Sequence, residues 1–141
     1  MMIEQISIFL ENKHGKLSEI LALLGREKIR IMAAMIADTL EFGILRMIVS
    51  DPQKTHRILK ENNVNASLSE VLGIVTESTA ETFASTLSLF AQAGLSIEYM
   101  YCFSVKEKSF LILKANDHEA SLDVINRNNL KYITINEIID L

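Results

Sequence analysis

The chain repeats itself with a period of 66 residues. When the sequence is shifted by that period, GILRMIV at 43–49 falls on SFLILKA at 109–115, and SDP at 50–52 falls on NDH at 116–118. No gap is needed from about residue 15 to about residue 133 because the apolar positions coincide, although few residues are identical. Self-similarity at a fixed period indicates one structural unit written twice. The fold must therefore be built from two copies of that unit.

The first copy has the hydrophobic pattern of a mixed α and β unit. Apolar residues at helical spacing from Leu17 to Leu24 predict an amphipathic helix, and the β-branched apolar runs around it predict strands. Asp51 and Pro52 predict a helix start, with the aspartate as cap and the proline in the first turn. The expected order is strand, helix, strand, strand, helix, strand, over residues 3–10, 14–28, 29–37, 42–50, 51–62 and 64–75.

The second copy predicts the same order, with Gly94 ending its first helix and Asp117 capping its second. Its elements are expected over residues 70–76, 79–93, 95–104, 109–116, 117–128 and 130–135. The chain is therefore predicted to be an α+β protein with two ferredoxin-like βαββαβ units in tandem, each with two helices on one face of an antiparallel sheet. We expect domains over residues 1–68 and 69–141. Because units of about 65 residues are marginally stable alone, we also expect a homodimer.

Charge and cysteine content exclude several classes of protein. The net charge of -4 gives no electrostatic footprint for nucleic acid, and RNA-binding units of this kind need stacking aromatic residues on central strands. Cys102 is the only cysteine, so it forms no intrachain disulfide, and we expect it to be a small core residue. The longest apolar run, residues 31–37, is too short to span a membrane. A cytoplasmic protein is expected.

No catalytic constellation is visible in the sequence. It contains no phosphate-binding glycine loop and no CxxC pair, and His14, His56 and His118 do not have the spacing of metal ligands. We therefore expect no catalytic residue, no metal and no cofactor. The scaffold alone does not exclude an enzyme. Acylphosphatase-like chemistry, however, would need an arginine in the first loop, and residues 11–17 contain none.

The turn NKHGKL at residues 12–17 is the strongest candidate for a binding site. The N–H groups and partial positive charge of a helix start favour a carboxylate. Gly15 lets a ligand approach the backbone, and Asn12 can cap the helix or accept a hydrogen bond from an ammonium group. An α-amino acid carries both of these groups. The residues leave a second interpretation open, in which Asn12 and Gly15 only form a tight turn.

Three segments resemble tandem ACT-domain proteins: NKHGKL at 12–17, IADTLEFGILR at 36–46 and IEYMY at 97–101. The resemblance covers nearly the whole chain. It implies a non-catalytic regulatory protein that binds a small ligand, usually an amino acid, at the interface between ACT domains. The ligand-binding residues it implies are Asn12, Lys13, His14, Gly15, Lys16, Leu17, Tyr99, Met100 and Tyr101. Because side chains alternate along a strand, Met100 is expected to face away from both tyrosines.

The resemblance also implies an alternative function, as the regulatory subunit of an amino-acid biosynthetic enzyme such as acetolactate synthase, acting through protein contact. The chain departs from the family at His14, where proline is usual, and at Glu81, which occupies the glycine position in the second copy. Ser78 and Glu81 match a capping box, which would place the protein's own carboxylate at the second helix start. We therefore expect the second turn to be purely structural, with one amino acid bound per chain.

Overall fold

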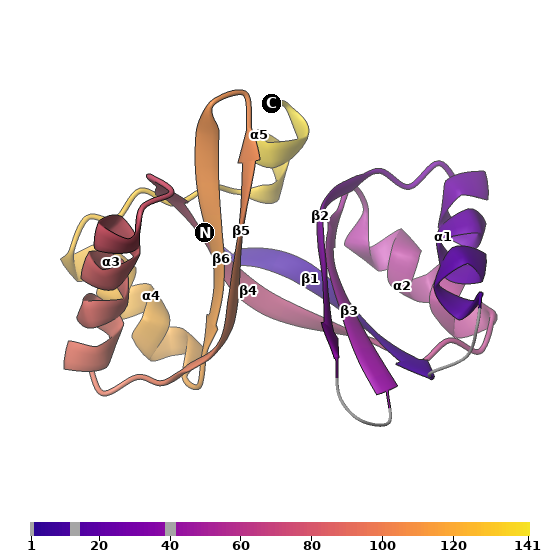
Figure 1. The fold of residues 1–141 in the computed structure, drawn as a ribbon, viewed down its shortest axis with the longest axis horizontal. Helices are drawn as coiled ribbons and strands as arrows, with labels where there is room; N and C mark the ends of the chain where they lie inside the picture. The colour runs from indigo at the N-terminus through magenta and orange to yellow at the C-terminus, as the bar shows by residue number, and fades with distance from the viewer. Residues whose placement is uncertain (1, 12–14, 39–41) are drawn as a thin grey trace. The chain divides into compact units, whose positions relative to one another are not determined.

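The computed structural model describes residues 2–11, 15–38 and 42–141. Its elements, in chain order, are β1 (Met2–Glu11), α1 (Lys16–Arg26), β2 (Ile31–Asp38), β3 (Phe42–Val49), α2 (Pro52–Glu61), β4 (Ala66–Thr76), α3 (Ala80–Gln92), β5 (Ile97–Val105), β6 (Lys108–Ala115), α4 (His118–Arg127) and α5 (Ile135–Ile139) (Figure 1). The predicted succession of βαββαβ units is confirmed up to the last strand.

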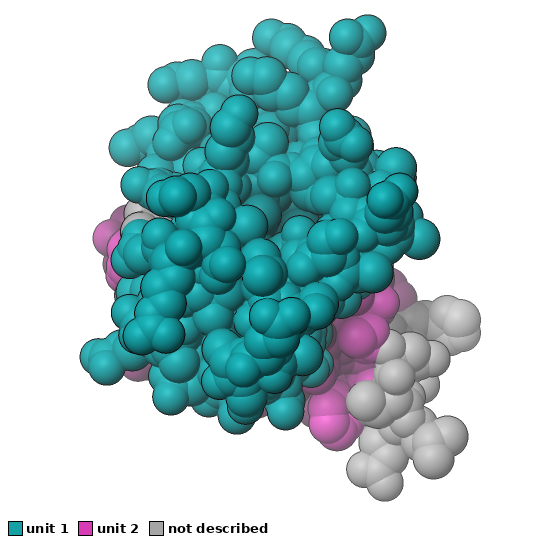
Figure 2. Space-filling view, turned by 90° about the vertical axis from the view of Figure 1, so that its left-hand side faces the viewer, with its two compact units in different colours: residues 1–3, 70–141 teal, residues 4–69 magenta. Residues whose placement is uncertain are grey.

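The chain divides into two compact units (Figure 2). The N-terminal unit is Glu4–Ser69, shown in magenta, and the C-terminal unit is Met1–Ile3 with Glu70–Leu141, shown in teal. Both β1 and β4 therefore contribute residues to each unit. The predicted ACT-domain limits, 1–68 and 69–141, stay a prediction.

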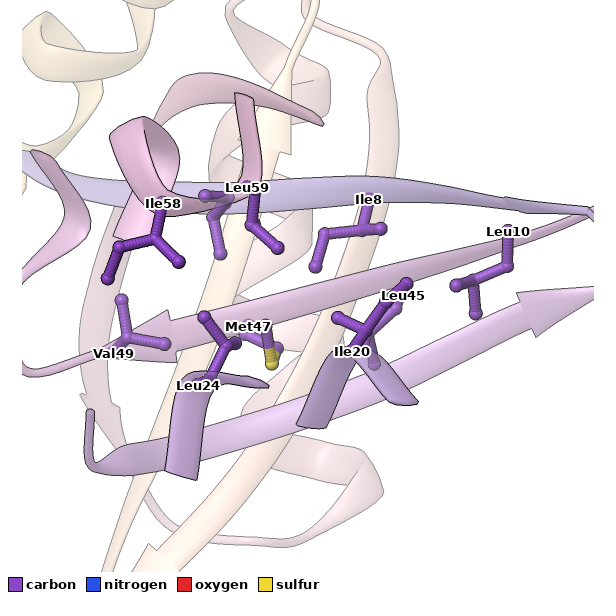
Figure 3. Close-up of a cluster of buried hydrophobic side chains, with 10 residues drawn as sticks. Ile8, Leu10, Ile20, Leu24, Leu45, Met47, Val49, Ile58 and Leu59 are labelled. Atoms are coloured by element: carbon purple, nitrogen blue, oxygen red, sulfur yellow. The ribbon is translucent and has the colours of Figure 1, made fainter. Parts of the chain in front are cut away.

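In the N-terminal unit the strand order is β2-β3-β1-β4, and β3 pairs antiparallel with both β1 and β2. Helices α1 and α2 cover one face of these strands (Figure 1). Side chains from the two helices and from β1 and β3 converge in one core (Figure 3). Its buried members are Ile6, Ile8, Leu10, Ile20, Leu24, Leu45, Met47, Val49, Ile58 and Leu59. Each side chain of this kind contributes about 1.5–3 kcal/mol by leaving water, so this core fixes α1 on the sheet.

In the C-terminal unit the strand order is β4-β6-β5, and β6 pairs antiparallel with both neighbours. Helices α3 and α4 pack on one face, and the core repeats that of the N-terminal unit. Its buried residues are Leu72, Ile74, Phe90, Leu111, Leu113, Val124 and Ile125.

The predicted last strand, residues 130–135, is wrong. Only an isolated bridge between Ile74 and Tyr132 forms there, and the chain then enters α5. The reason is local: Thr134 and Glu137 form a capping box, in which the Thr134 hydroxyl accepts from the Glu137 N–H and the Glu137 carboxylate accepts from the Thr134 N–H. These bonds satisfy helix-start groups and end the extended segment.

The 66-residue period is reproduced in backbone geometry. At the end of α2, the Asn62 side-chain amide donates to the Ile58 carbonyl at 2.8 Å, and at the end of α4 Asn128 donates to Val124 at 2.9 Å. The following residues, Asn63 and Asn129, both adopt left-handed backbone conformations, with φ of 59° and 50°. Asparagine is among the few residues that tolerate this region, so the same side chains end equivalent helices in the same way.

Two predicted caps are confirmed. The Asp51 carboxylate accepts from the Lys54 N–H at 3.1 Å, and the Asp117 carboxylate accepts from the Ala120 N–H at 3.0 Å. Both aspartates thus satisfy a helix-start N–H group that has no partner within the helix.

The predicted Ser78–Glu81 capping box is wrong. The N-cap of α3 is Thr79, whose hydroxyl accepts from the Thr82 N–H at 3.1 Å. Ser78 instead donates to the Ser109 hydroxyl at 2.7 Å, which holds it one residue outside the cap. The helix start is therefore closed by a neutral hydroxyl, and the Glu81 side chain is not part of a box.

Cys102 is exposed, so its prediction as a core residue is also wrong. It lies on β5, an outer strand of the C-terminal unit, and its sulfur is 3.7 Å from the Ser78 hydroxyl. On the same strand Met100 packs against the core. Cys102 lies two residues further along, beside the polar start of α3, where no apolar layer covers it.

Within the described residues, no helix is long and apolar enough to cross a membrane. No group of three or more His, Cys, Asp and Glu side chains in that part of the chain could hold a metal ion.

Candidate functional site

The predicted ligand-binding residues fall into three groups along the chain. Asn12, Lys13 and His14 lie outside the described residues. Gly15, Lys16 and Leu17 begin α1 in the N-terminal unit, whereas Tyr99, Met100 and Tyr101 lie on β5 in the C-terminal unit. A shared ligand site for these groups stays a prediction.

Gly15 is the N-cap of α1, whereas Asn12, the capping candidate from the sequence, lies outside the described residues. The backbone of Gly15 is left-handed, with φ of 78°, a conformation that glycine adopts without the steric cost of a side chain. Glycine has no side chain to offer the first N–H groups of α1, whereas the N-cap residues of α2, α3, α4 and α5 all accept from a backbone N–H. The start of α1 is thus the one among these five helices whose N-cap residue supplies no side-chain bond.

Lys16 and Leu17 have different roles. Leu17 is half-buried and packs against the core beneath α1, so it anchors the helix. Lys16 instead lines a surface cavity of about 400 Å³. The described residues of its lining are Phe9, Leu10, Glu11, Lys16, Phe42, Asn63, Val64 and Asn65. All of these residues belong to the N-terminal unit.

Two aromatic rings form an apolar wall of this cavity. The ring centroids of Phe9 and Phe42 lie 6.2 Å apart with an interplanar angle of 62°, an edge-to-face arrangement. Phe9 is 40% exposed and Phe42 is 38% exposed. Such rings lie inside in most proteins, and here their exposed surface faces a concavity of ligand size.

Sheet register brings the two rings together. Glu11, the last residue of β1, is opposite Phe42, the first residue of β3. Phe9 lies two positions before Glu11, so all three side chains project from the same face. This face is opposite the one that carries Ile8 and Leu10 into the core, and it therefore presents the rings to solvent.

The turn between α2 and β4 supplies the remaining wall. The Val64 N–H donates to the Leu59 carbonyl at 2.9 Å, and the Phe9 N–H donates to the Asn65 carbonyl at 2.9 Å. These two bonds fix residues 63–65 beside the end of β1. Backbone hydrogen bonds therefore link this turn to α2 and to β1 at the cavity.

The cavity combines groups of both charges with apolar surface. Lys16 provides an ammonium group and Glu11 a carboxylate, and Asn63 and Asn65 provide amide side chains. Phe9, Phe42, Leu10 and Val64 provide the apolar part. This set of groups is suited to binding a small zwitterion that has an apolar side chain.

Sequence reasoning missed every lining residue except Lys16. The available signal was an aromatic residue near the end of one strand and another at the start of its antiparallel partner, together with the polar turn NNVN at 62–65. Those segments become neighbours only through the register of β1 and β3 and the turn after α2. Spacing along the chain does not reveal them.

The alternation predicted for β5 is found. Met100 is opposite Leu113 and packs against the core, whereas Tyr101 is opposite Ile112 on the other face. Tyr99 is opposite Lys114, next to an irregularity in the pairing after Ile97. All three side chains of the predicted site on this strand are half-buried.

The whole chain, residues 1–141, matches the family model described as an ACT domain pair. Its structure is similar to that of protein BT0572 from Bacteroides thetaiotaomicron, with a TM-score of 0.91 and 33% identity over 100% of this chain and 98% of that one. The regulatory subunit of aspartate kinase from Thermus thermophilus has a similar fold, with a TM-score of 0.61 and 20% identity over 88% and 91% of the two chains. The regulatory subunit of aspartate kinase from Thermus flavus gives a TM-score of 0.60 and 18% identity, over 90% of this chain and 94% of that one. A search of curated proteins finds no match. Because the family model matches its full length, the chain belongs to the ACT domain pair family.

Proposed function

We propose that the protein is a non-catalytic regulator that binds an amino acid with a large apolar side chain in the cavity beside α1. The observation that carries this proposal is the lining itself, in which one ammonium group, one carboxylate and an aromatic wall share about 400 Å³. Membership in a family of regulatory domains supports the same function.

The charges favour a zwitterion. The ligand carboxylate is proposed to approach Lys16 and the start of α1, where the helix dipole adds a favourable term. The ligand ammonium group is proposed to approach Glu11. Each pairing combines opposite charges at a partly exposed site, where a contact at about 4 Å is attractive by roughly 1–4 kcal/mol before desolvation. Because the described residues of the lining include a charged group of each sign, a ligand with one group of each sign matches them.

The aromatic wall favours a large apolar side chain. Leucine has three more carbon atoms than alanine, and each buried methylene contributes about 0.8 kcal/mol. The difference, about 2.4 kcal/mol, corresponds to roughly 50-fold tighter binding of leucine. Serine and aspartate would place polar groups against Phe9 and Phe42 and should bind more weakly still.

Isothermal titration with a panel of amino acids tests the proposal. We expect leucine, isoleucine, methionine or phenylalanine to bind best, and Phe42→Ala to weaken that ligand at least tenfold. Ile36→Ala is the matched control, because Ile36 is an exposed apolar residue of the same unit that does not line the cavity. Equal affinities of the wild type and Phe42→Ala for the preferred ligand would refute this site. Binding of no amino acid at all would refute the function.

A regulatory subunit of an amino-acid biosynthetic enzyme is the second candidate. The observation that favours it is the outer strand β2 of the N-terminal unit, where Ile31 is 41% exposed and Ile36 is 50% exposed. An outer strand with exposed branched apolar side chains is suited to pairing with another chain. Affinity purification from native lysate, with Ile36→Lys as control, should recover the enzyme only with the wild type. Recovery of the same enzyme with both proteins would exclude β2 as the contact.

A further inference from the structure

A second cavity, of about 520 Å³, lies in the C-terminal unit. It is lined by Val75, Lys108, Phe110, Leu130, Lys131, Tyr132, Ile133, Glu137 and Leu141. Four of these residues lie one period of 66 after residues that line the first cavity: Phe9 and Val75, Phe42 and Lys108, Val64 and Leu130, Asn65 and Lys131. The two cavities therefore occupy the same position in the two copies of the repeat.

Backbone hydrogen bonds show the same equivalence independently of the sequence alignment. In the N-terminal unit the Phe9 N–H donates to the Asn65 carbonyl at 2.9 Å, and in the C-terminal unit the Val75 N–H donates to the Lys131 carbonyl at 2.8 Å. The turn that precedes each bond is also held alike. Its closing bond runs from the Leu130 N–H to the Ile125 carbonyl at 3.1 Å in the C-terminal unit, one period after the Val64 bond described above. The same arrangement of backbone hydrogen bonds is therefore found beside both cavities.

The chemistry of the two linings differs. Lys108 occupies the position equivalent to Phe42 of the first cavity, and Lys131 occupies the position equivalent to Asn65. Because Val75 also replaces Phe9, both rings of the aromatic pair are absent from the second cavity, and two lysines are added. Phe110 and Ile133 are buried and form an apolar floor.

Glu137 is the one acidic side chain in this lining, and it is already engaged. Its carboxylate accepts from the Thr134 hydroxyl at 2.9 Å and from the Thr134 N–H at 3.3 Å, as part of the capping box of α5. The lining thus carries two positive side chains and one carboxylate held by the helix cap. A ligand with two acid groups complements the two lysines, whereas Lys16 is the one lysine or arginine among the described residues that line the first cavity.

We propose that the second cavity binds a small dicarboxylate, such as an acidic amino acid. This replaces the expectation that the second copy is purely structural, which depended on a capping box that does not form. The proposal depends on the second cavity alone and does not require the proposed ligand of the first.

The test is isothermal titration of the whole chain with L-glutamate and with glutarate at low salt. We expect both to bind, and we expect the double variant Lys108→Phe with Lys131→Asn to weaken both at least tenfold, because each lost charge-assisted contact corresponds to about tenfold or more. This variant installs the residues of the first cavity. The control variant Arg57→Phe with Lys60→Asn removes the same charge from exposed positions on α2 and should leave glutamate affinity unchanged.

Leucine binding, measured on the same proteins, separates the two sites. It should be unchanged in the Lys108 and Lys131 double variant, and its absence in every protein would count against the first site alone. The proposal is overturned if neither dicarboxylate binds the wild type, or if the double variant and the control lose affinity equally. If the double variant does not fold by circular dichroism, the exposed single variant Lys131→Gln carries the test. An unchanged glutamate affinity in that variant would overturn the proposal.

Discussion

Replacement of Gly15 tests whether this glycine is needed only for the conformation of the backbone or also for ligand binding. With φ of 78°, Gly15 occupies the left-handed region, and a β-carbon built on it would meet no heavy atom of the described residues within 4 Å. The cost of Gly15→Ala is therefore conformational, about 1–2 kcal/mol. This corresponds to a fall of roughly 3–8 °C in Tm for a chain of this size. Gly15→Val should cost more, because β-branched side chains fit this region worst.

Gly94 provides a matched control. It has φ of 77° and likewise no heavy atom within 4 Å of a built β-carbon, but it follows α3 in the C-terminal unit. Gly94→Ala should therefore lower Tm by nearly the same amount as Gly15→Ala. Only the Gly15 substitutions alter the backbone next to Lys16, which lines the first cavity.

The assay is isothermal titration of the preferred amino acid, with circular dichroism and thermal unfolding on the same samples. We expect Gly15→Ala to raise the Kd at least tenfold and Gly15→Val to abolish binding, with the fold retained, whereas Gly94→Ala leaves the Kd unchanged. Gly15→Asn should lose less than Gly15→Ala, because asparagine tolerates the left-handed region. Normal binding by Gly15→Val would refute the reasoning, since the turn would then be structural only.

Three further predictions concern packing, capping and assembly. Gly73→Ala should destabilise the protein by about 1–3 kcal/mol in thermal unfolding, because its β-carbon would lie 2.5 Å from Ile3 Cδ1 and 2.9 Å from Ile133 Cγ2; an unchanged Tm would show that both isoleucines move freely. Thr134→Ala should cost about 1 kcal/mol through loss of the α5 capping box, whereas Thr134→Ser should cost little. Light scattering should find the mass of a homodimer, for which twofold symmetry is expected, and a monomer at all concentrations would contradict this assembly.

The repeat, the order of its elements up to the last strand and several of their ends could be predicted from the amino-acid sequence alone. Apolar spacing distinguishes helix from strand because a buried face recurs every 3.6 residues in one and every two in the other. Asp51 and Asp117 cap helices through their own neighbours along the chain. These features depend on contacts within a few residues, so they can be read from a linear pattern.

Tertiary structure decided the features that depend on residues distant in sequence. Thr79, rather than Ser78, caps α3 because Ser109 binds the Ser78 hydroxyl across 31 positions. Cys102 is exposed because it lies on an outer strand beside that polar start.

Which residues line each cavity also depends on tertiary structure. Phe9 and Phe42 form one wall only because the register of β1 and β3 places Glu11 opposite Phe42, and the turn at 63–65 joins them through a bond to β1. A periodic pattern shows that a face is apolar or polar, but it does not show which strand ends meet. Strand register and long-range hydrogen bonds decide that, and with it the chemistry that each copy of the repeat presents to a ligand.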